Sequence, residues 1–247
     1  MARAAVLGRL RRLPWLTATV RDVVAETPRV RTIVLDVDGW TGHRAGQHLD
    51  VRLTAEDGYQ AERTYSIASA PEEALVRISV ELVEDGEVSP YLAGELAPGD
   101  VFEIRGPVGG YFTWSVQDGG PLLLVGGGSG VVPLMAMLRH HAAHASTVDA
   151  RLLVSARSWG GVLYRDELSR LAVPVHYTLT RERPEGWTGF DRRVDAAMLT
   201  AVGPAPAERP LIFVCGPTAF VEPVADLLVE LGHDPGSIHA ERFGPTG

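Results

Sequence analysis

The sequence predicts two domains, an antiparallel β-barrel followed by a parallel α/β domain. Up to about residue 114, short alternating apolar runs are separated by turn residues. After residue 120 the pattern changes to strand, helix, strand, helix. Between a strand and a helix of this second part lies the glycine-rich run 126–130. Many short strands with Gly, Pro and Asp turns are typical of barrels, and strand–helix alternation is typical of parallel sheets.

The expected elements of the first part are strands, with one short helix over residues 89–94. The strands are predicted at residues 16–24, 30–37, 48–53, 75–82 and 101–104. Asp38-Gly39, Asp57-Gly58, Asp85-Gly86 and Pro98-Gly99 supply turn signals. We expect a tail at residues 1–14, the barrel at 15–115 and a linker at about 115–120.

The second domain is expected at residues 121–247, with its strands at 121–125, 151–155, 175–180, 211–215 and 237–239. Helices are predicted at 132–144, 164–171, 192–199 and 219–231. Pro223 lies near the start of the last helix, where we expect it within the first turn because proline breaks a helix interior.

Composition excludes several kinds of site. The 247 residues are 45% hydrophobic and carry a net charge of −8, which disfavours nucleic acid as a partner. The single cysteine, Cys215, excludes an internal disulfide, a four-cysteine zinc site and a protein-held iron–sulfur cluster. No apolar run approaches the about 20 residues of a membrane span. A reducing cytoplasm fits a chain with one cysteine, and we expect a monomer that does not bind membranes.

The N-terminal segment carries four arginines and has two interpretations. Arg3, Arg9, Arg11 and Arg12 could belong to a frayed tail, or to a basic arm that contacts an acidic redox partner. The sequence leaves both open.

Glycines at 126–128 and 130 allow a tight turn, and bare N–H groups at a helix start attract phosphate. A glycine-rich turn needed for packing alone is the other interpretation. Upstream, Arg63 and Tyr65 alternate with Thr64 and Ser66, so the cation and the ring share one face of a strand. That pair suits a ligand with a phosphate and a flat ring, although an ordinary Arg–Tyr stack fits as well.

Gly86 and Ser89 form a turn that opens a short helix and could present N–H groups to an anion. Simple capping of the helix by Ser89 is the alternative. A rigid turn, Gly106-Pro107-Val108-Gly109, then ends the barrel pattern.

In this order, the motifs resemble those of the ferredoxin–NADP reductase family, over nearly the whole chain. Arg63, Tyr65 and Ser66 match its flavin motif, and Gly86 and Ser89 match its pyrophosphate turn. The Gly-Pro-x-Gly turn, residues 126–130 and Cys215-Gly216-Pro217 match its remaining motifs. The resemblance implies a flavin-binding barrel, a Rossmann-like NAD(P)-binding domain, and FAD with NADPH as cofactors.

The resemblance also implies roles for single residues. Arg63 would hold the flavin pyrophosphate, Tyr65 would stack on the flavin ring, and Ser66 would lie near its N5 atom. Ser66, Cys215 and Glu241 are the expected catalytic residues, with Cys215 beside the nicotinamide. Further cofactor contacts are expected from Thr64, Arg77, Ser79, Gly86, Val88, Ser89, Gly128, Ser129, Gly130, Gly216, Pro217 and Phe243.

The adenosine end of the dinucleotide decides between NADPH and NADH. Ser155 and Arg157 follow one predicted strand and Arg181 follows the next, so they should meet at the ligand crevice. Arginines bind phosphate with charge-assisted hydrogen bonds, which favours the 2′-phosphate of NADPH. Tyr164 resembles the family tyrosine that stacks on adenine. Surface arginines without a ligand are the alternative.

His140 and His144 are four residues apart and could share a helix face as metal ligands. No carboxylate or cysteine accompanies them in the sequence, so we expect no metal site.

The predicted function is hydride transfer from NADPH to FAD, with electrons passing to a separate carrier such as a ferredoxin or flavodoxin. The run 241–244 looks like the point where fused relatives continue toward a ferredoxin domain. Three alternatives stay open: a reductase of free flavin or small molecules, an electron-transfer subunit of a larger complex, and a flavin-free dehydrogenase.

Overall fold

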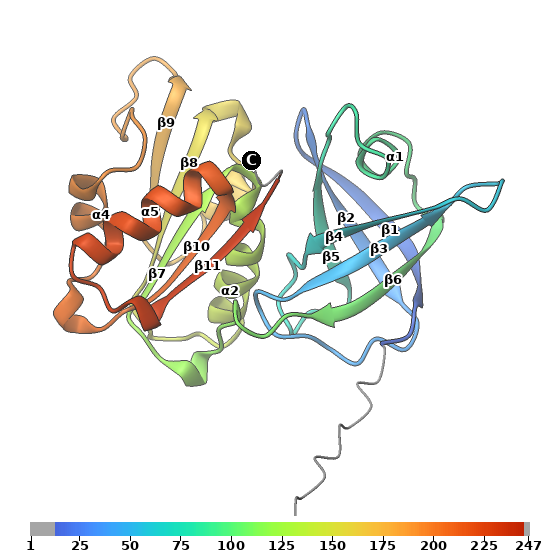
Figure 1. The fold of residues 1–247 in the computed structure, drawn as a ribbon, viewed down its shortest axis with the longest axis horizontal. Coiled ribbons are helices and arrows are strands. Elements are labelled where there is room, and N and C mark those ends of the chain that lie inside the picture. The colour runs from blue at the N-terminus through green and yellow to red at the C-terminus, as the bar shows by residue number, and fades with distance from the viewer. Residues whose placement is uncertain (1–12, 245–247) are drawn as a thin grey trace, which may run out of the picture.

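The computed structural model describes residues 13–244, which form two domains side by side (Figure 1). The arginine-rich segment, with its two interpretations, lies outside the described residues. The six-stranded sheet ends with β6 (Val101–Val108), and the five-stranded sheet begins with β7 (Leu122–Gly127). An antiparallel barrel followed by a parallel α/β domain confirms the predicted fold class.

The first sheet has the strand order β4-β3-β6-β1-β2-β5. Its other strands are β1 (Leu16–Thr27), β2 (Val30–Val37), β3 (His48–Thr54), β4 (Gln60–Ser66) and β5 (Val76–Glu81). All pairings are antiparallel, and a bridge between Ile67 and Ile78 joins the two edge strands. Inward-facing side chains such as Ile33, Leu49 and Ile104 fill this closed barrel.

The second sheet has the order β11-β10-β7-β8-β9 and is parallel throughout. It contains β8 (Ala150–Ser158), β9 (Val175–Glu182), β10 (Leu211–Pro217) and β11 (Ile238–Phe243). Successive residues of β7 pack on opposite faces: Leu122 and Leu124 on one, Leu123 and Val125 on the other. Because both faces are covered, the strand is apolar without alternation.

Helices cover both faces of the parallel sheet (Figure 1). The face toward the barrel carries α2 (Val131–Ala143) and the short α3 (Arg165–Leu168). The other face carries α4 (Ala196–Val202) and α5 (Thr218–Glu230). Barrel residues Ala45, Ala68 and Phe112 join the core around α2, so apolar packing continues from one domain into the other.

Three expectations about helices need correction. The helix expected at 164–171 is reduced to α3, and the one expected at 192–199 begins later. Asp195 fixes that later start, because its carboxylate accepts a hydrogen bond from the N–H of Met198 at 2.8 Å. Pro223 lies inside α5 beyond the first turn. The short helix α1 (Ser89–Gly94) is found as predicted.

Within residues 13–244, no helix combines the length and the apolar character needed to cross a bilayer.

Candidate active site

A cavity of about 770 Å³ opens where the two domains meet. The carboxyl ends of the five parallel strands form one wall, and the turn between β1 and β2, with Glu81, forms the other. Ligands of parallel sheets bind at this edge. The predicted residues that line the cavity are Gly128, Ser129, Ser155, Arg157, Pro217 and Phe243.

The glycine-rich loop has the geometry that a phosphate needs. Gly128 has a φ of +57°, and a Cβ built there would meet no atom within 4 Å, so its surface is free. Gly130 is the opposite case, because a Cβ there would lie 2.1 Å from the carbonyl oxygen of Cys215. The loop therefore packs on β10 behind and is open in front, at the N-terminus of α2, where the helix dipole favours an anion.

The two arginines expected near the adenosine lie differently. Arg157 is exposed and lines the cavity beside Ser155, whereas Arg181 does not line it and Thr180 does. In the part of the chain that the structure describes, Arg157 has no ion-pair partner. Its guanidinium is therefore free for a phosphate.

Tyr164 corrects another expectation. Only 4% of the residue is exposed, its hydroxyl is hydrogen-bonded to Ser79, and Arg139 lies 5.1 Å from its ring centre. Burial raises the pKa of this phenol to about 12. A ring with this environment has no free face for adenine. It joins the second domain to the barrel instead.

Ser79 and Arg77 are likewise occupied within the protein. The buried hydroxyl of Ser79 is shared between Thr32, at 2.7 Å, and Tyr164. Arg77 pairs with Glu73 at 3.0 Å. Neither lines the cavity, and their expected contacts with a cofactor stay predictions.

Arg63 is half-exposed on β4 and pairs with Glu87 at 2.6 Å. The hydroxyl of Tyr59 donates to the same carboxylate at 2.7 Å. On the same strand Tyr65 is half-buried against the barrel core, and burial raises the pKa of its phenol to about 12. A cation and a ring on one strand, beside the 86–89 turn, fit a flavin nucleotide.

The other residues of this region are placed as follows. Thr64 donates to Asp50 at 2.7 Å. Gly86 closes a turn by donating to the carbonyl of Val83 at 2.9 Å, and Val88 is fully buried. The hydroxyl of Ser89 accepts from the N–H of Val83 at 3.1 Å rather than capping α1, which it begins. The capping alternative for Ser89 is therefore wrong.

Two of the three expected catalytic residues come together. Cys215 on β10 and Glu241 on β11 are register partners. Burial, and after it the charge of Glu241, raises the pKa of the Cys215 thiol well above its usual value. His48 of β3 lies 3.5 Å from Glu241 across the domain boundary, and its register partner on β4 is the third expected residue, Ser66. Strands of both domains thus converge on one place.

Sequence reasoning missed several residues of this region, four of which bear on its chemistry. Glu81 and Arg29 reach the cavity from the barrel, and Phe220 reaches it from α5. His48 faces Glu241 from β3. The positions of Glu81, Arg29 and His48 depend on how the domains dock. Phe220 packs on Gly127 and Gly216 within the second domain, and it alone has a nearby signal, the Cys-Gly-Pro motif.

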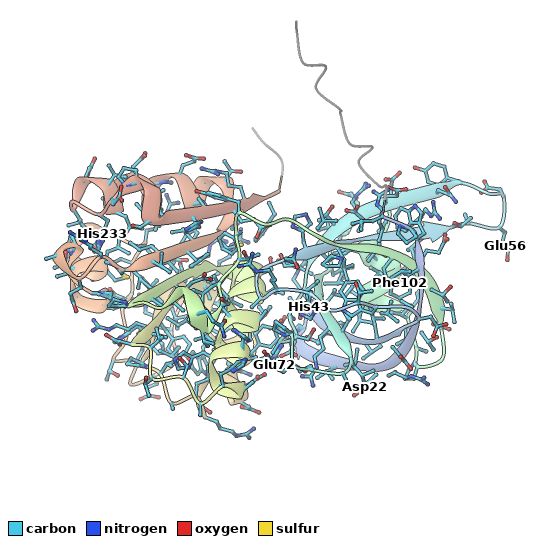
Figure 2. The ribbon with its side chains drawn as sticks, turned by 90° about the horizontal axis from the view of Figure 1, so that it is seen from below. Asp22, His43, Glu56, Glu72, Phe102 and His233 are labelled. Atoms are coloured by element: carbon cyan, nitrogen blue, oxygen red, sulfur yellow. The ribbon has the colours of Figure 1, made fainter. Side chains whose placement is uncertain are left out.

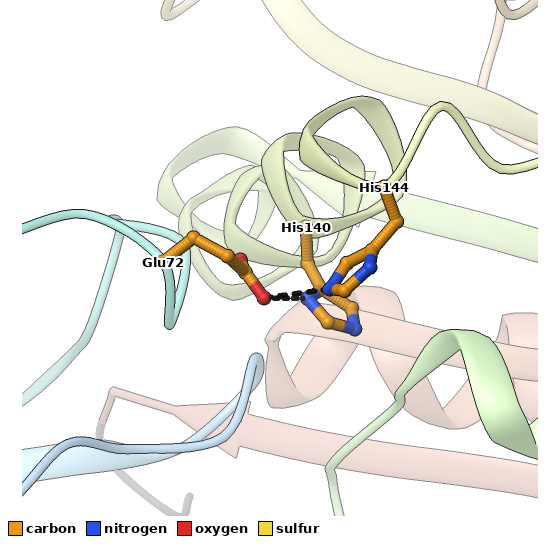
Figure 3. Close-up of side chains that lie close together, drawn as sticks. All are labelled: Glu72, His140 and His144. Carbon is orange, nitrogen blue, oxygen red and sulfur yellow. Dashed lines mark hydrogen bonds and ion pairs between the residues drawn. The ribbon is translucent and has the colours of Figure 1, made fainter.

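A cluster at the domain boundary brings Glu72 between His140 and His144 (Figure 3). The expectation that no carboxylate accompanies these histidines is therefore wrong. His140 Nδ1 and His144 Nε2 lie 2.8 and 2.9 Å from one oxygen of Glu72. His140 Nε2 accepts from the N–H of Val116 at 3.3 Å, so its proton is on Nδ1 and points at Glu72. The arrangement is that of a hydrogen-bonded contact between domains.

Comparison with known proteins agrees with this architecture. Residues 18–113 match the oxidoreductase FAD-binding domain, and residues 124–226 match the oxidoreductase NAD-binding domain. The chain belongs to the FAD- and NAD-binding oxidoreductases. This confirms the resemblance to the ferredoxin–NADP reductase family.

Individual relatives cover most of the chain. The glycine betaine monooxygenase reductase subunit of Pseudomonas aeruginosa is 32% identical, over 91% of this chain and 63% of that protein. The chain thus spans less than two thirds of this relative's length. The FAD/NAD-binding domain of Vibrio cholerae nitric oxide dioxygenase has a TM-score of 0.83 at 25% identity and covers 93% of this chain and 99% of that one. The cytochrome P450 reductase of Amycolatopsis has a TM-score of 0.82 at 27% identity, and the match covers 99% of this chain and 74% of that one.

Proposed function

We propose that this oxidoreductase transfers a hydride from NADPH to FAD and passes the electrons to a separate ferredoxin- or flavodoxin-like carrier. The observation that carries the proposal is the cavity between the phosphate loop and the barrel. When bound, FAD accepts a hydride and releases electrons singly. The chain's own contribution is to orient the two rings and exclude water, because hydride transfer needs near-contact and no acid–base pair.

Residues of the cavity, together with side chains of β4 and β10, would supply this orientation. The open loop at Gly128 would receive the dinucleotide pyrophosphate, and Arg157 would receive the 2′-phosphate. On the barrel, Arg63 would hold the flavin pyrophosphate and Tyr65 would lie against the flavin ring. The neutral thiol of Cys215, beside Glu241, would border the nicotinamide without adding a charge.

The names of similar proteins support a separate electron acceptor. They are named as the reductase subunit of glycine betaine monooxygenase and as a cytochrome P450 reductase. An absorption spectrum of the purified protein, followed by anaerobic addition of NADPH and then NADH, tests the flavin and its reduction. Fast turnover with free flavins and none with ferredoxin or flavodoxin would contradict the proposed acceptor.

The preference for NADPH has its own test. We expect Arg157→Ala to raise KM for NADPH at least about tenfold and KM for NADH little, because a charge-assisted phosphate contact is lost. Arg181→Ala is the matched control, since Arg181 is also exposed but does not line the cavity. Equal effects of Arg157→Ala on both nucleotides would refute the 2′-phosphate assignment.

A further inference from the structure

A carboxylate of the barrel reaches into the phosphate loop of the other domain. The hydroxyl of Ser129, in the middle of the loop, lies 2.8 Å from Glu81 at the end of β5 and donates to it. Both residues line the cavity. A serine hydroxyl has one hydrogen to donate, so this hydrogen is not available to another acceptor while the contact lasts.

Glu81 differs in charge from the other ionisable residues that line the cavity. Among the described residues that line it, Glu81 is the one carboxylate, while Arg29 and Arg157 are the cations. Arg29 does not neutralise it, because its guanidinium pairs with Glu84 at 3.0 Å and donates to the carbonyl of Leu82 at 2.8 Å. A negative group thus lies within hydrogen-bond distance of a loop whose other features attract anions.

Dinucleotide binding would bring a second anion to the same place. The free surface of Gly128 and the start of α2 would receive the pyrophosphate, next to Ser129. A carboxylate and a phosphate at adjacent positions repel one another. Only one of them can accept the hydrogen of Ser129.

We propose that Glu81 competes internally with the dinucleotide pyrophosphate for the phosphate loop. Without nucleotide, Glu81 accepts from Ser129 and holds the loop against the barrel. When the pyrophosphate binds, it takes the hydrogen of Ser129 and displaces the carboxylate. Glu81 thereby lowers affinity for the oxidised and the reduced nucleotide alike, which favours release of the oxidised product after each turnover. This inference rests on the proposed function.

The test is calorimetric titration of the flavin-loaded protein with NADP⁺ and with NAD⁺, which bind without reacting. We expect Glu81→Gln to tighten binding about tenfold at low salt, a modest charge effect of about 1.4 kcal/mol. The factor should be the same for both nucleotides, because they share the pyrophosphate. At 1 M salt the factor should fall close to one, since the electrostatic screening length is then about 3 Å.

Glu103→Gln is the matched control, because it changes the net charge by the same amount. Glu103 of β6 pairs with Arg52 of β3, and neither residue lines the cavity. The affinities of this variant should equal those of the parent. Unchanged or weaker binding by Glu81→Gln would overturn the proposal, and weaker binding would assign Glu81 to the nucleotide's hydroxyl groups. If neither the parent nor the variants bind either nucleotide, the proposed function itself fails.

Discussion

Arg63 has an anionic partner within the protein, and this changes how its role should be tested. Its guanidinium pairs with Glu87, which belongs to the turn expected to bind the flavin pyrophosphate. Both side chains are about half-exposed, so their mutual attraction contributes little to stability. Arg63 can therefore exchange Glu87 for a phosphate at small cost.

We expect Arg63→Ala to weaken flavin retention by about 1.5–3 kcal/mol, the usual cost of losing a hydrogen bond to a charged group. Flavin released on dilution, followed by its fluorescence, measures the change. Arg21→Ala is the control, because Arg21 is a similarly exposed arginine paired with Asp36 elsewhere on the barrel. Flavin retained by Arg63→Ala as tightly as by the parent would show that the assignment is wrong.

Cys215 is a second residue whose environment predicts its chemistry. Only 1% of the residue is exposed, and the pKa of its thiol is raised chiefly by burial. Because the thiolate is the reactive form, a buried neutral thiol is inert. We expect iodoacetamide to label Cys215 far more slowly in the folded protein than in urea at pH 8. Mass spectrometry of the alkylated protein measures this, and equal rates in both states would contradict the buried, neutral thiol.

At the scale of elements, the junction from β7 to α2 depends on close backbone approach. A side chain at Gly130 would overlap the backbone of β10, which cannot shift without disturbing the sheet. Close packing on β10 therefore requires glycine at residue 130, whether or not the junction binds a phosphate. The packing interpretation of the glycine-rich run holds for Gly130, while Gly128 remains free for a ligand.

We expect Gly130→Ala to lower the free energy of unfolding by more than about 2 kcal/mol, through strain of an overpacked backbone contact. Urea denaturation followed by tryptophan fluorescence measures it. The control is Gly160→Ala, because a Cβ at Gly160 meets no atom within 4 Å. A Gly130→Ala protein as stable as Gly160→Ala would show that the junction has room for a side chain at residue 130.

At the scale of the whole molecule, buried polar contacts join the domains. Arg139 of α2 donates to the carbonyl of Ala68 in the barrel at 2.6 Å and pairs with Glu167 at 2.6 Å. The Glu72 cluster lies at the same boundary, and Figure 2 places Glu72 and His43 on the side of the barrel that faces the second domain. These contacts fix the relative position of the cavity walls.

We expect Glu72→Ala to lower the free energy of unfolding by about 1–3 kcal/mol at pH 7, because the buried Nδ1–H of His140 loses its acceptor. Partial burial opposes ionisation of Glu72, yet hydrogen bonds from His144 and His140 hold its pKa below the usual 4.5. A carboxylate whose pKa is lowered by folding stabilises the protein fully at a pH above its pKa in the unfolded state. This stabilisation is lost as the pH falls through its pKa in the folded state.

Denaturation of the parent and Glu72→Ala at pH 7 and at decreasing pH below 4.5 measures both effects. The difference between the two proteins should shrink as the pH falls. A constant difference over that range would mean that the charge of Glu72 plays no part.

The sequence by itself determined the two-domain order, most strand positions, the phosphate loop and the position of Arg157. These follow from local periodicity and turn chemistry, which neighbouring residues suffice to fix. Only the tertiary structure decided that Tyr164 and Ser79 meet inside the domain boundary, that Glu72 joins the histidines, and that Glu81 reaches Ser129. Each of these contacts joins residues far apart in the chain. Their positions depend on how two separately patterned cores dock, which no local pattern encodes.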